Sequence, residues 1–131
     1  MSKTEKQVEK DILSEARTAG DTLYRNNNGI LKAGARWVSF GLKGGTTKVK
    51  KGSSDYIGYT SVKITPAMVG KTVAVFVACE VKKPGGTPSA EQVEFTDTAA
   101  KAGAIAFIAD SVIEYKQRMK SWKTNIKRRK K

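Results

Sequence analysis

Two acidic residues and a lysine have the types and spacing that phosphate chemistry requires. Glu80 and Lys82 end the apolar run 73–82, and Asp55 heads another apolar segment. Side chains alternate along a strand, so Glu80 and Lys82 are expected on one face, roughly 6–7 Å apart. The carboxylates of Asp55 and Glu80 and the carbonyl of Val81 are oxygen ligands of the kind that Mg²⁺ prefers. Lys82 would hold or help deprotonate a water and offset charge at phosphorus. The alternative is a plain Glu80–Lys82 ion pair, since charges ending a buried strand need partners.

The composition of the chain indicates which class of molecule it binds. The chain has 131 residues, a length suited to one domain, and its net charge is +13 with a pI near 10.0. Such a charge favours a polyanion, and nucleic acid is the leading candidate because Lys and Arg neutralise its phosphates. A membrane surface is the competitor, but no long apolar span or basic amphipathic anchor is evident, so we expect no membrane contact.

Missing residue types exclude several kinds of chemistry. The sequence has no histidine, which excludes histidine general bases, Ser-His-Asp triads and histidine metal sites. Cys79 is the single cysteine, so neither an internal disulfide nor a thiolate zinc cage can form. Cys79 shares the apolar face of its strand and is expected to be a small core residue. Residues 1–19 are charged throughout and predict no signal peptide, which favours a reducing cytosol.

The pattern of elements predicts one α/β domain over residues 1–122, with a central mixed β-sheet flanked by helices. Helices are predicted over residues 4–19, 89–102 and 111–122, and strands over 23–25, 36–40, 55–59, 71–82 and 104–109. Residues 26–29 are expected to form a turn. The unit 71–109 should form a parallel, right-handed strand–helix–strand crossover. The basic segment 123–131 is expected to be a disordered tail.

The first predicted helix carries an acid on its apolar side. Ser2 or Thr4 is the expected cap, and Gly20 the stop. At about 100° per residue, Glu5 falls on the stripe of Val8 and the apolar residues that follow it. The alternative for Glu5 is a favourable first-turn charge at the helix dipole. Glu9 lies about 40° to one side and is the reserve for the same role.

Together these segments resemble a known nuclease superfamily. Ser53-Ser54-Asp55 followed by Glu80-Val81-Lys82 resembles the bipartite motif of the PD-(D/E)xK nucleases. The wider set is Glu5 in a helix, Arg25 to Gly29, Gly52 to Asp55, and Glu80 to Gly86 leading to Ser89 and Gln92. In that order it looks like the VRR-Nuc branch, whose stand-alone members occur in phages and mobile elements. The resemblance spans residues 5–109 and leaves out the last helix and the tail.

The resemblance implies a restriction-endonuclease-like core and a DNA endonuclease that depends on Mg²⁺ or Mn²⁺. It also implies a homodimer that cuts branched DNA such as four-way (Holliday) junctions. By motif position Asp55 and Glu80 would bind metal, Lys82 would be catalytic, and Glu5 would be an accessory carboxylate. Gln92 would be a polar catalytic-site contact, although Ser89 with Gln92 three residues later is also a capping box, and the two roles are compatible. Ser54 stands where the motif has proline.

Basic residues around these segments are the expected DNA contacts. The loop 41–54 is rich in glycine and lysine, and either follows a phosphate backbone or forms a solvated hairpin tip. The residues predicted to bind DNA are Arg25, Lys43, Lys48, Lys50, Lys51, Lys83, Lys127, Arg128 and Arg129. A non-catalytic nucleic-acid-binding protein and a nuclease targeted by a partner protein are the rival functions. The expected location is the cytoplasm of a bacterium or of a phage-infected host cell.

Overall fold

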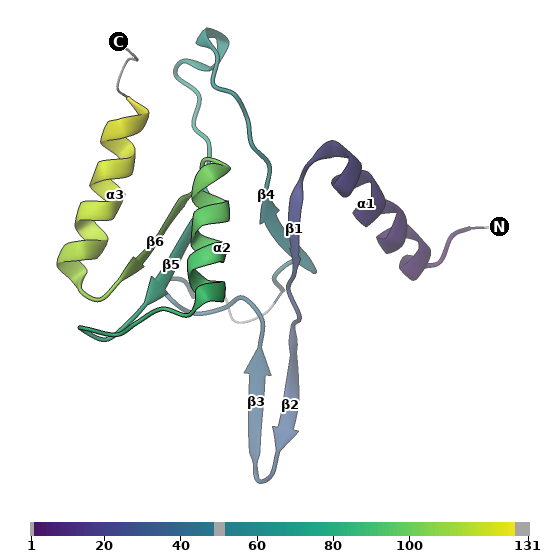
Figure 1. Ribbon diagram of the computed structural model, residues 1–131. Coiled ribbons are helices and arrows are strands. Elements are labelled where there is room, and N and C mark those ends of the chain that lie inside the picture. The colour runs from purple at the N-terminus through teal and green to yellow at the C-terminus, as the bar shows by residue number, and fades with distance from the viewer. Residues whose placement is uncertain (1, 49–51, 128–131) are drawn as a thin grey trace. The chain divides into compact units, whose positions relative to one another are not determined.

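The computed structural model describes residues 2–48 and 52–127 (Figure 1). In these residues the protein is mixed α/β, with three α-helices and three two-stranded sheets. The chain divides after Thr60 into two compact units, an N-terminal and a C-terminal one. Among the helices of the described residues, none combines the length and the apolar character that crossing a bilayer requires.

The N-terminal unit begins with helix α1, Glu5–Ala19, where the sequence predicted it. The Thr4 side chain accepts a hydrogen bond from the Gln7 backbone N–H, and the Gln7 side chain accepts one from the Thr4 N–H. This capping box satisfies two of the N–H groups that a helix start leaves without partners. Gly20 ends the helix with a φ of 82°, a left-handed conformation that favours glycine.

Strands β1, Thr22–Arg25, and β4, Tyr56–Tyr59, pair antiparallel in this unit. The register places Arg25 opposite Tyr56 and Leu23 opposite Gly58. The two backbones approach closely at Gly58, where an added Cβ would lie 1.7 Å from the carbonyl oxygen of Thr22. Only glycine therefore fits this point of the strand pair.

Strands β2, Gly29–Ala33, and β3, Arg36–Phe40, form a hairpin in the same unit. Its two-residue turn begins at Gly34, whose φ of 64° suits the first central position of a type II′ turn. The sequence predicted β3 but no strand over residues 30–33, and it placed Gly29 in a turn. In the structure Gly29 is instead the first residue of β2 and pairs with Phe40.

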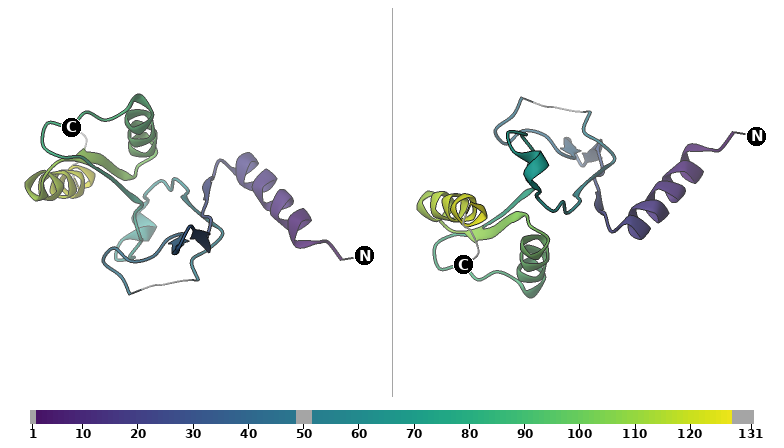
Figure 2. Two further views of the ribbon diagram at one scale, coloured as in Figure 1. Left: turned by 90° about the horizontal axis from the view of Figure 1, so that it is seen from below. Right: turned by 90° about the horizontal axis from the view of Figure 1, so that it is seen from above.

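The C-terminal unit contains the predicted strand–helix–strand crossover. Strand β5, Val77–Val81, pairs in parallel with β6, Ile105–Ala109, and helix α2, Ala90–Lys101, connects them. A short 3₁₀ helix, Pro66–Met68, precedes β5. Helix α3, Val112–Ile126, follows β6 and begins at Ser111, whose hydroxyl accepts from the Glu114 N–H. Figure 2 shows α2 and α3 on opposite sides of the strand pair.

The core of this unit lies between β6 and α3. Ile105, Phe107 and Ala109 alternate along β6 and are buried, and Met119 and Trp122 of α3 pack against them. The other face of the strand pair meets α2, whose Ala99 is fully buried. The prediction of a short buried strand over residues 104–109 is confirmed.

The prediction of a long strand over residues 71–82, covered on both faces, was wrong. Only Val77–Val81 forms a strand, because β6 offers just five residues for pairing. Val77 and Val81 are 43% and 75% exposed, since α3 contacts β6 and, in the described chain, does not contact β5. Cys79 shares this uncovered face and is exposed rather than part of the core. Partial burial and, second, the Glu80 carboxylate raise the pKa of its thiol.

Helix α3 also runs four residues past its predicted end at Trp122. Residues 123–126, which were expected to belong to a disordered tail, are helical. Carbonyl groups in the last turn around Met119 and Trp122 need N–H partners four residues later, and this extra turn supplies them. Residues 128–131 lie outside the described part of the chain.

Candidate active site

Glu80, Lys82 and Gln92 meet at one end of the C-terminal strand pair. The Gln92 Nε2 donates a hydrogen bond of 2.7 Å to Glu80 Oε1, and the Lys82 Nζ lies 3.9 Å from the same oxygen. The Lys82 side chain is 25% exposed and that of Glu80 is 37% exposed. Glu80 and Lys82 therefore share a face of the strand, as their spacing predicted, and that face is the one that α2 covers.

Gln92 reaches Glu80 because a capping box fixes the start of α2. Its backbone N–H donates to Ser89 Oγ at 3.1 Å, and its Oε1 accepts from the Ser89 N–H at 2.9 Å. The Nε2 atom remains for Glu80. One amide thus performs both roles that the sequence left open, capping the helix and binding Glu80. It restricts the carboxylate to a single orientation.

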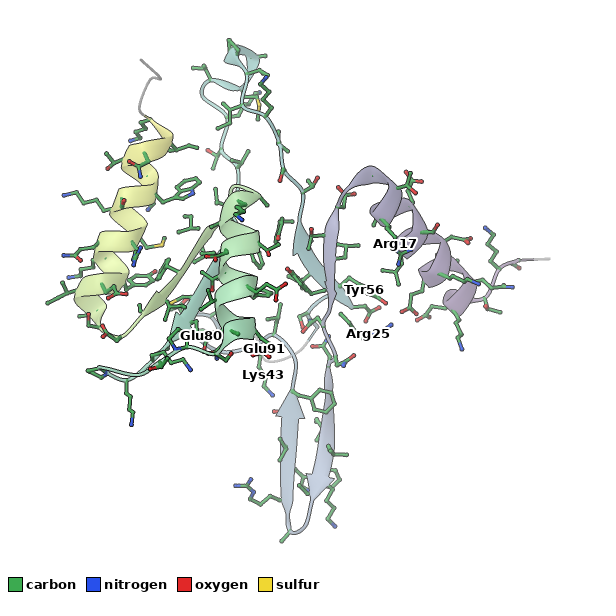
Figure 3. The ribbon with its side chains drawn as sticks, viewed as in Figure 1. Arg17, Arg25, Lys43, Tyr56, Glu80 and Glu91 are labelled. Atoms are coloured by element: carbon green, nitrogen blue, oxygen red, sulfur yellow. The ribbon has the colours of Figure 1, made fainter. Side chains whose placement is uncertain are left out.

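A cavity of about 330 Å³ opens beside this cluster. Glu91 lines it together with Glu80 and Gln92, and Phe95 and Thr96 complete the α2 side. Figure 3 shows Glu80 and Glu91 where α2 begins. Glu91 has no place in the motif. The signal that could have found it is its position two residues after the helix cap Ser89. A second carboxylate near Glu80 favours a cationic ligand in this cavity.

The backbone carbonyl of Val81 faces the edge of β5 that is remote from β6. Ile105 N donates to Phe76 O, and Lys82 N donates to Ala109 O, each at 2.9 Å. Backbone groups of alternate residues point to opposite sides of a strand, so those of Phe76, Glu80 and Lys82 face β6. The groups of Val81 then point the other way. This carbonyl is therefore available to a ligand, as the metal prediction requires.

The N-terminal unit contains its own acidic cavity, of about 710 Å³. Asp55 lies in it directly before β4, and Glu5 and Glu9 reach it from α1. Asp55 is exposed, and its backbone carbonyl accepts a hydrogen bond from the Asn26 N–H at 2.7 Å. Asp55 therefore shares one cavity with both helix carboxylates, although it lies far from both of them in the sequence.

Glu9 is the carboxylate of this cavity that already has partners. Tyr56 and Arg25 both donate to its Oε1, Arg25 at 2.9 Å, and the Arg25 guanidinium lies 5.3 Å from the centre of the Tyr56 ring. Figure 3 shows Arg25 and Tyr56 together at the end of the β1–β4 pair. The hydrogen bond from Tyr56 and, less, the charge of Arg25 lower the pKa of Glu9. Glu5 makes no hydrogen bond or ion pair with the other described residues, which makes it the more available accessory carboxylate.

Two asparagines hold the segment that precedes Asp55. Asn26 donates from Nδ2 to Ser53 Oγ at 2.8 Å and to the Ser54 carbonyl at 2.7 Å. Asn28 donates to the Ser53 carbonyl at 2.9 Å and accepts from Ser53 Oγ at 2.6 Å. The two motif segments Arg25–Gly29 and 52–55 are therefore hydrogen-bonded partners. The sequence indicated both segments but did not predict the contact between them. This contact fixes the position of the segment that leads into Asp55.

The predicted metal ligands belong to the two units separately. Glu5 and Asp55 lie in the N-terminal unit, whereas Glu80, the Val81 carbonyl, Lys82 and Gln92 lie in the C-terminal unit. In residues 2–48 and 52–127, no group of three or more Cys, Asp or Glu side chains is arranged to hold a metal ion. Magnesium often takes only one or two carboxylates and fills its shell with water and substrate, so the chemistry of the donor set fits.

The predicted DNA contacts fall into three groups. Lys43, Lys48, Lys83 and Lys127 are exposed, and Lys43 donates to Ser39. Arg25 is engaged with Glu9, as described above. The remaining predicted contacts, Lys50, Lys51, Arg128 and Arg129, lie outside the described residues. Lys116 and Lys120 of α3 were missed, although their spacing with Lys123 on one helical face can be read from the sequence.

Comparison of the whole chain with family models, with curated proteins and with solved structures gives no match.

Proposed function

We propose that this chain is an endodeoxyribonuclease that requires a divalent metal and cuts branched DNA such as four-way junctions. In this proposal the α/β fold is a restriction-endonuclease-like core of the VRR-Nuc type. The protein acts as a homodimer in the cytoplasm of a bacterium or of a phage-infected cell. The resemblance supplies the branched substrate and the dimer, and the charge of +13 supports a nucleic-acid partner.

The observation that carries the proposal is the arrangement around Glu80. A partly buried lysine lies 3.9 Å from the carboxylate, and an amide from the next helix donates to the same oxygen at 2.7 Å. Both contacts use Oε1, and among the described residues none uses Oε2. Carboxylates that bind a metal are themselves held by hydrogen bonds from neighbouring groups. The contact from Gln92 fits this arrangement, because it holds Oε1 and leaves Oε2 to a cation.

Residues of this chain have distinct roles in the proposed reaction. A bound Mg²⁺ or Mn²⁺ supplies polarisation of the scissile phosphate and activation of water. In the C-terminal unit Glu80 and the Val81 carbonyl would hold it, and by motif position alone Asp55, with Glu5 as the accessory carboxylate, is a further proposed ligand. Gln92 orients Glu80. The Lys82 ammonium, held beside Glu80 with only a quarter of its side chain exposed, orients the attacking water and stabilises the negative charge that develops on the phosphate.

The test is cleavage of a labelled panel that contains a four-way junction, a flap and a linear duplex. We expect the wild-type protein to cut the branched substrates with Mg²⁺ or Mn²⁺ and to cut nothing in EDTA. Glu80→Gln and Lys82→Ala should lower the cleavage rate by about 100-fold or more, because each removes an interaction with the reacting phosphate or its water. Their DNA affinity, measured without metal, should stay within about twofold, because other lysines hold the backbone.

Two control variants lie beside these positions. Glu94→Gln removes an exposed acid from helix α2, and Lys83→Ala removes the exposed lysine next to Lys82. Glu94→Gln should cleave normally, and Lys83→Ala should weaken binding without affecting the cleavage rate of bound DNA. A wild-type protein that cuts no member of the panel with either metal would refute the proposal. So would a Lys82→Ala variant that cuts at the normal rate.

A second candidate function is nucleic-acid binding without catalysis. The same observation favours it in part, because Lys82 and Glu80 at 3.9 Å also satisfy the definition of a simple ion pair. In this alternative the basic surface binds nucleic acid, and no residue of the chain is catalytic. The panel separates the two, since a binding protein would retain DNA at low salt and release no product.

A further inference from the structure

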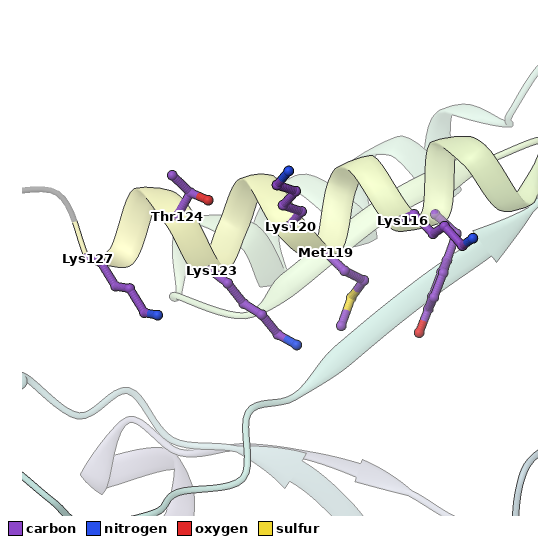
Figure 4. Close-up of a pocket in the computed structure, with 7 residues that line it drawn as sticks. Lys116, Met119, Lys120, Lys123, Thr124 and Lys127 are labelled. Atoms are coloured by element: carbon purple, nitrogen blue, oxygen red, sulfur yellow. The ribbon is translucent and has the colours of Figure 1, made fainter.

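A row of four lysines follows one face of helix α3. Lys116, Lys120, Lys123 and Lys127 are spaced by four, three and four residues. At 100° per residue they fall within an arc of about 60°, and they extend over about 16 Å of the helix axis. All four are exposed, and they line a groove of about 680 Å³ together with Tyr115 and Met119. Figure 4 shows Met119, Lys123 and Lys127 extending to one side of the helix and Lys120 extending to the other.

The helix that carries this row is fixed by its apolar face. Met119 and Trp122 pack against the buried residues of β6, and the Tyr115 ring makes an edge contact with Phe107 at 5.8 Å between centroids. The lysine stems are therefore attached to a rigid support, and only their flexible ends must be ordered by a ligand. Such preorganisation lowers the entropic cost of binding an extended polyanion.

The charge of the row is not neutralised by the protein. Within the described residues none of the four lysines forms an ion pair with an acid. No Asp or Glu lines the groove, and the acid of α3, Glu114, belongs to its first turn. Four like charges within one groove repel one another, so the groove favours a ligand that brings several negative charges at a similar spacing.

We propose that this groove binds the backbone of a single strand of nucleic acid. The lysines contact successive phosphates, and Tyr115 with Met119 offers an apolar floor on which an unpaired base can stack. A duplex keeps its bases paired inside the helix and would leave this floor unused. No residue of the groove belongs to either acidic cluster, so the inference stands apart from the proposed hydrolysis and goes beyond it.

The test is binding of a fluorescent oligothymidylate of about 20 nucleotides, measured by anisotropy in EDTA between about 50 and 200 mM salt. The variant combines Lys116→Gln, Lys120→Gln and Lys123→Gln. Each lost phosphate contact should lower the log–log salt slope by about 0.7, so the slope should fall by about 2. At about 0.15 M salt this corresponds to roughly 50-fold weaker binding.

The matched control removes the same charge elsewhere in the same unit. It combines Lys63→Gln, Lys71→Gln and Lys101→Gln, all exposed residues away from α3. The inference is overturned if this control loses as much affinity and slope as the α3 variant, because net charge alone would then explain both.

Tyr115→Leu tests the apolar floor, since leucine keeps an apolar side chain at this position but removes the ring. It should weaken oligothymidylate binding by about 5- to 100-fold and leave a duplex of equal length within about twofold. Equal losses for the single strand and the duplex would overturn the assignment to a single strand. Circular dichroism of each variant confirms that the helices are retained.

Discussion

Replacing Gly58 with alanine is expected to break the strand pair that presents Asp55. The added Cβ would lie 1.7 Å from the Thr22 carbonyl oxygen and 2.9 Å from the Leu23 Cα, whereas ordinary contact begins at 3.4 Å. Both obstacles are backbone atoms, so no side-chain rotation relieves the clash. Strand β1 must move away from β4 by more than 1 Å, and hydrogen bonds near Gly58 lengthen beyond their useful range.

The expected cost follows from the bonds that are lost. The pair joins only four residues on each strand, and losing two or three backbone hydrogen bonds at about 1 kcal/mol each gives about 2–3 kcal/mol. Urea unfolding followed by circular dichroism should show a midpoint lowered by about 1–2 M with an unchanged slope.

Gly29→Ala is the matched control, because neither glycine has a positive φ and both lie in strands. Its added Cβ would lie 2.8 Å from the Phe40 Cζ, the end of a side chain that is 43% exposed and can rotate. We expect a change below about 1 kcal/mol. Equal midpoints for the two variants would refute the reasoning that a rigid backbone contact at Gly58 determines the pairing.

Two further predictions concern single side chains. Tyr56→Phe removes a donor to Glu9, whose folded pKa is lowered from 4.5, so the stabilisation it provides is complete above pH 4.5 and lost as pH falls through the lowered pKa. Urea midpoints of wild type and Tyr56→Phe should differ near pH 7 and approach each other as the pH falls below 4.5 and through the lowered pKa of Glu9; a gap that does not narrow would contradict this. Gln92→Ala should cost about 1–2 kcal/mol, because it removes the partner of the Ser89 N–H and the donor to Glu80. Gln92→Glu keeps the acceptor for Ser89 but replaces the donor with a carboxylate that repels Glu80, so its unfolding midpoint should stay below that of the wild type and cleavage should stay low; normal cleavage by this variant would separate the amide from the activity.

Local signals predicted the helices well. Thr4, Ser89 with Gln92, and Ser111 located the starts of the three helices within a residue or two, and Gly20 located the end of α1, because capping involves groups only a few positions apart. The end of α3 was missed for the opposite reason. It depends on how Met119 and Trp122 pack against a strand that lies earlier in the chain.

Strand extents and burial could not be derived in the same way. The apolar residues from Val73 to Val77 have strand propensity, but a strand exists only where a partner pairs with it, and β6 begins at Ile105, opposite Val77. Whether Cys79 is covered depends on which strand α3 packs against, and no local sequence pattern determines that packing. The alternation that placed Glu80 beside Lys82 is intrinsic to any strand, which is why that part of the site was predictable.

The Ser53–Asn28 and Glu9–Tyr56 contacts lay beyond sequence reasoning, because each joins residues more than twenty positions apart. The Asn-rich segment and the Ser-rich segment are each typical of a turn. Neither sequence indicates that the two segments contact each other. The structure converts two such segments into one support for Asp55.

The double use of one amide by Gln92 leaves this position little freedom to drift in evolution. Asparagine is a methylene too short to span both partners, glutamate cannot donate, and an aliphatic residue can do neither. Any divergent descendant that keeps the glutamate and the serine should therefore keep the glutamine as well. The triplet Glu80, Ser89 and Gln92 is a more selective signature for recognising distant kin than the acidic motif by itself.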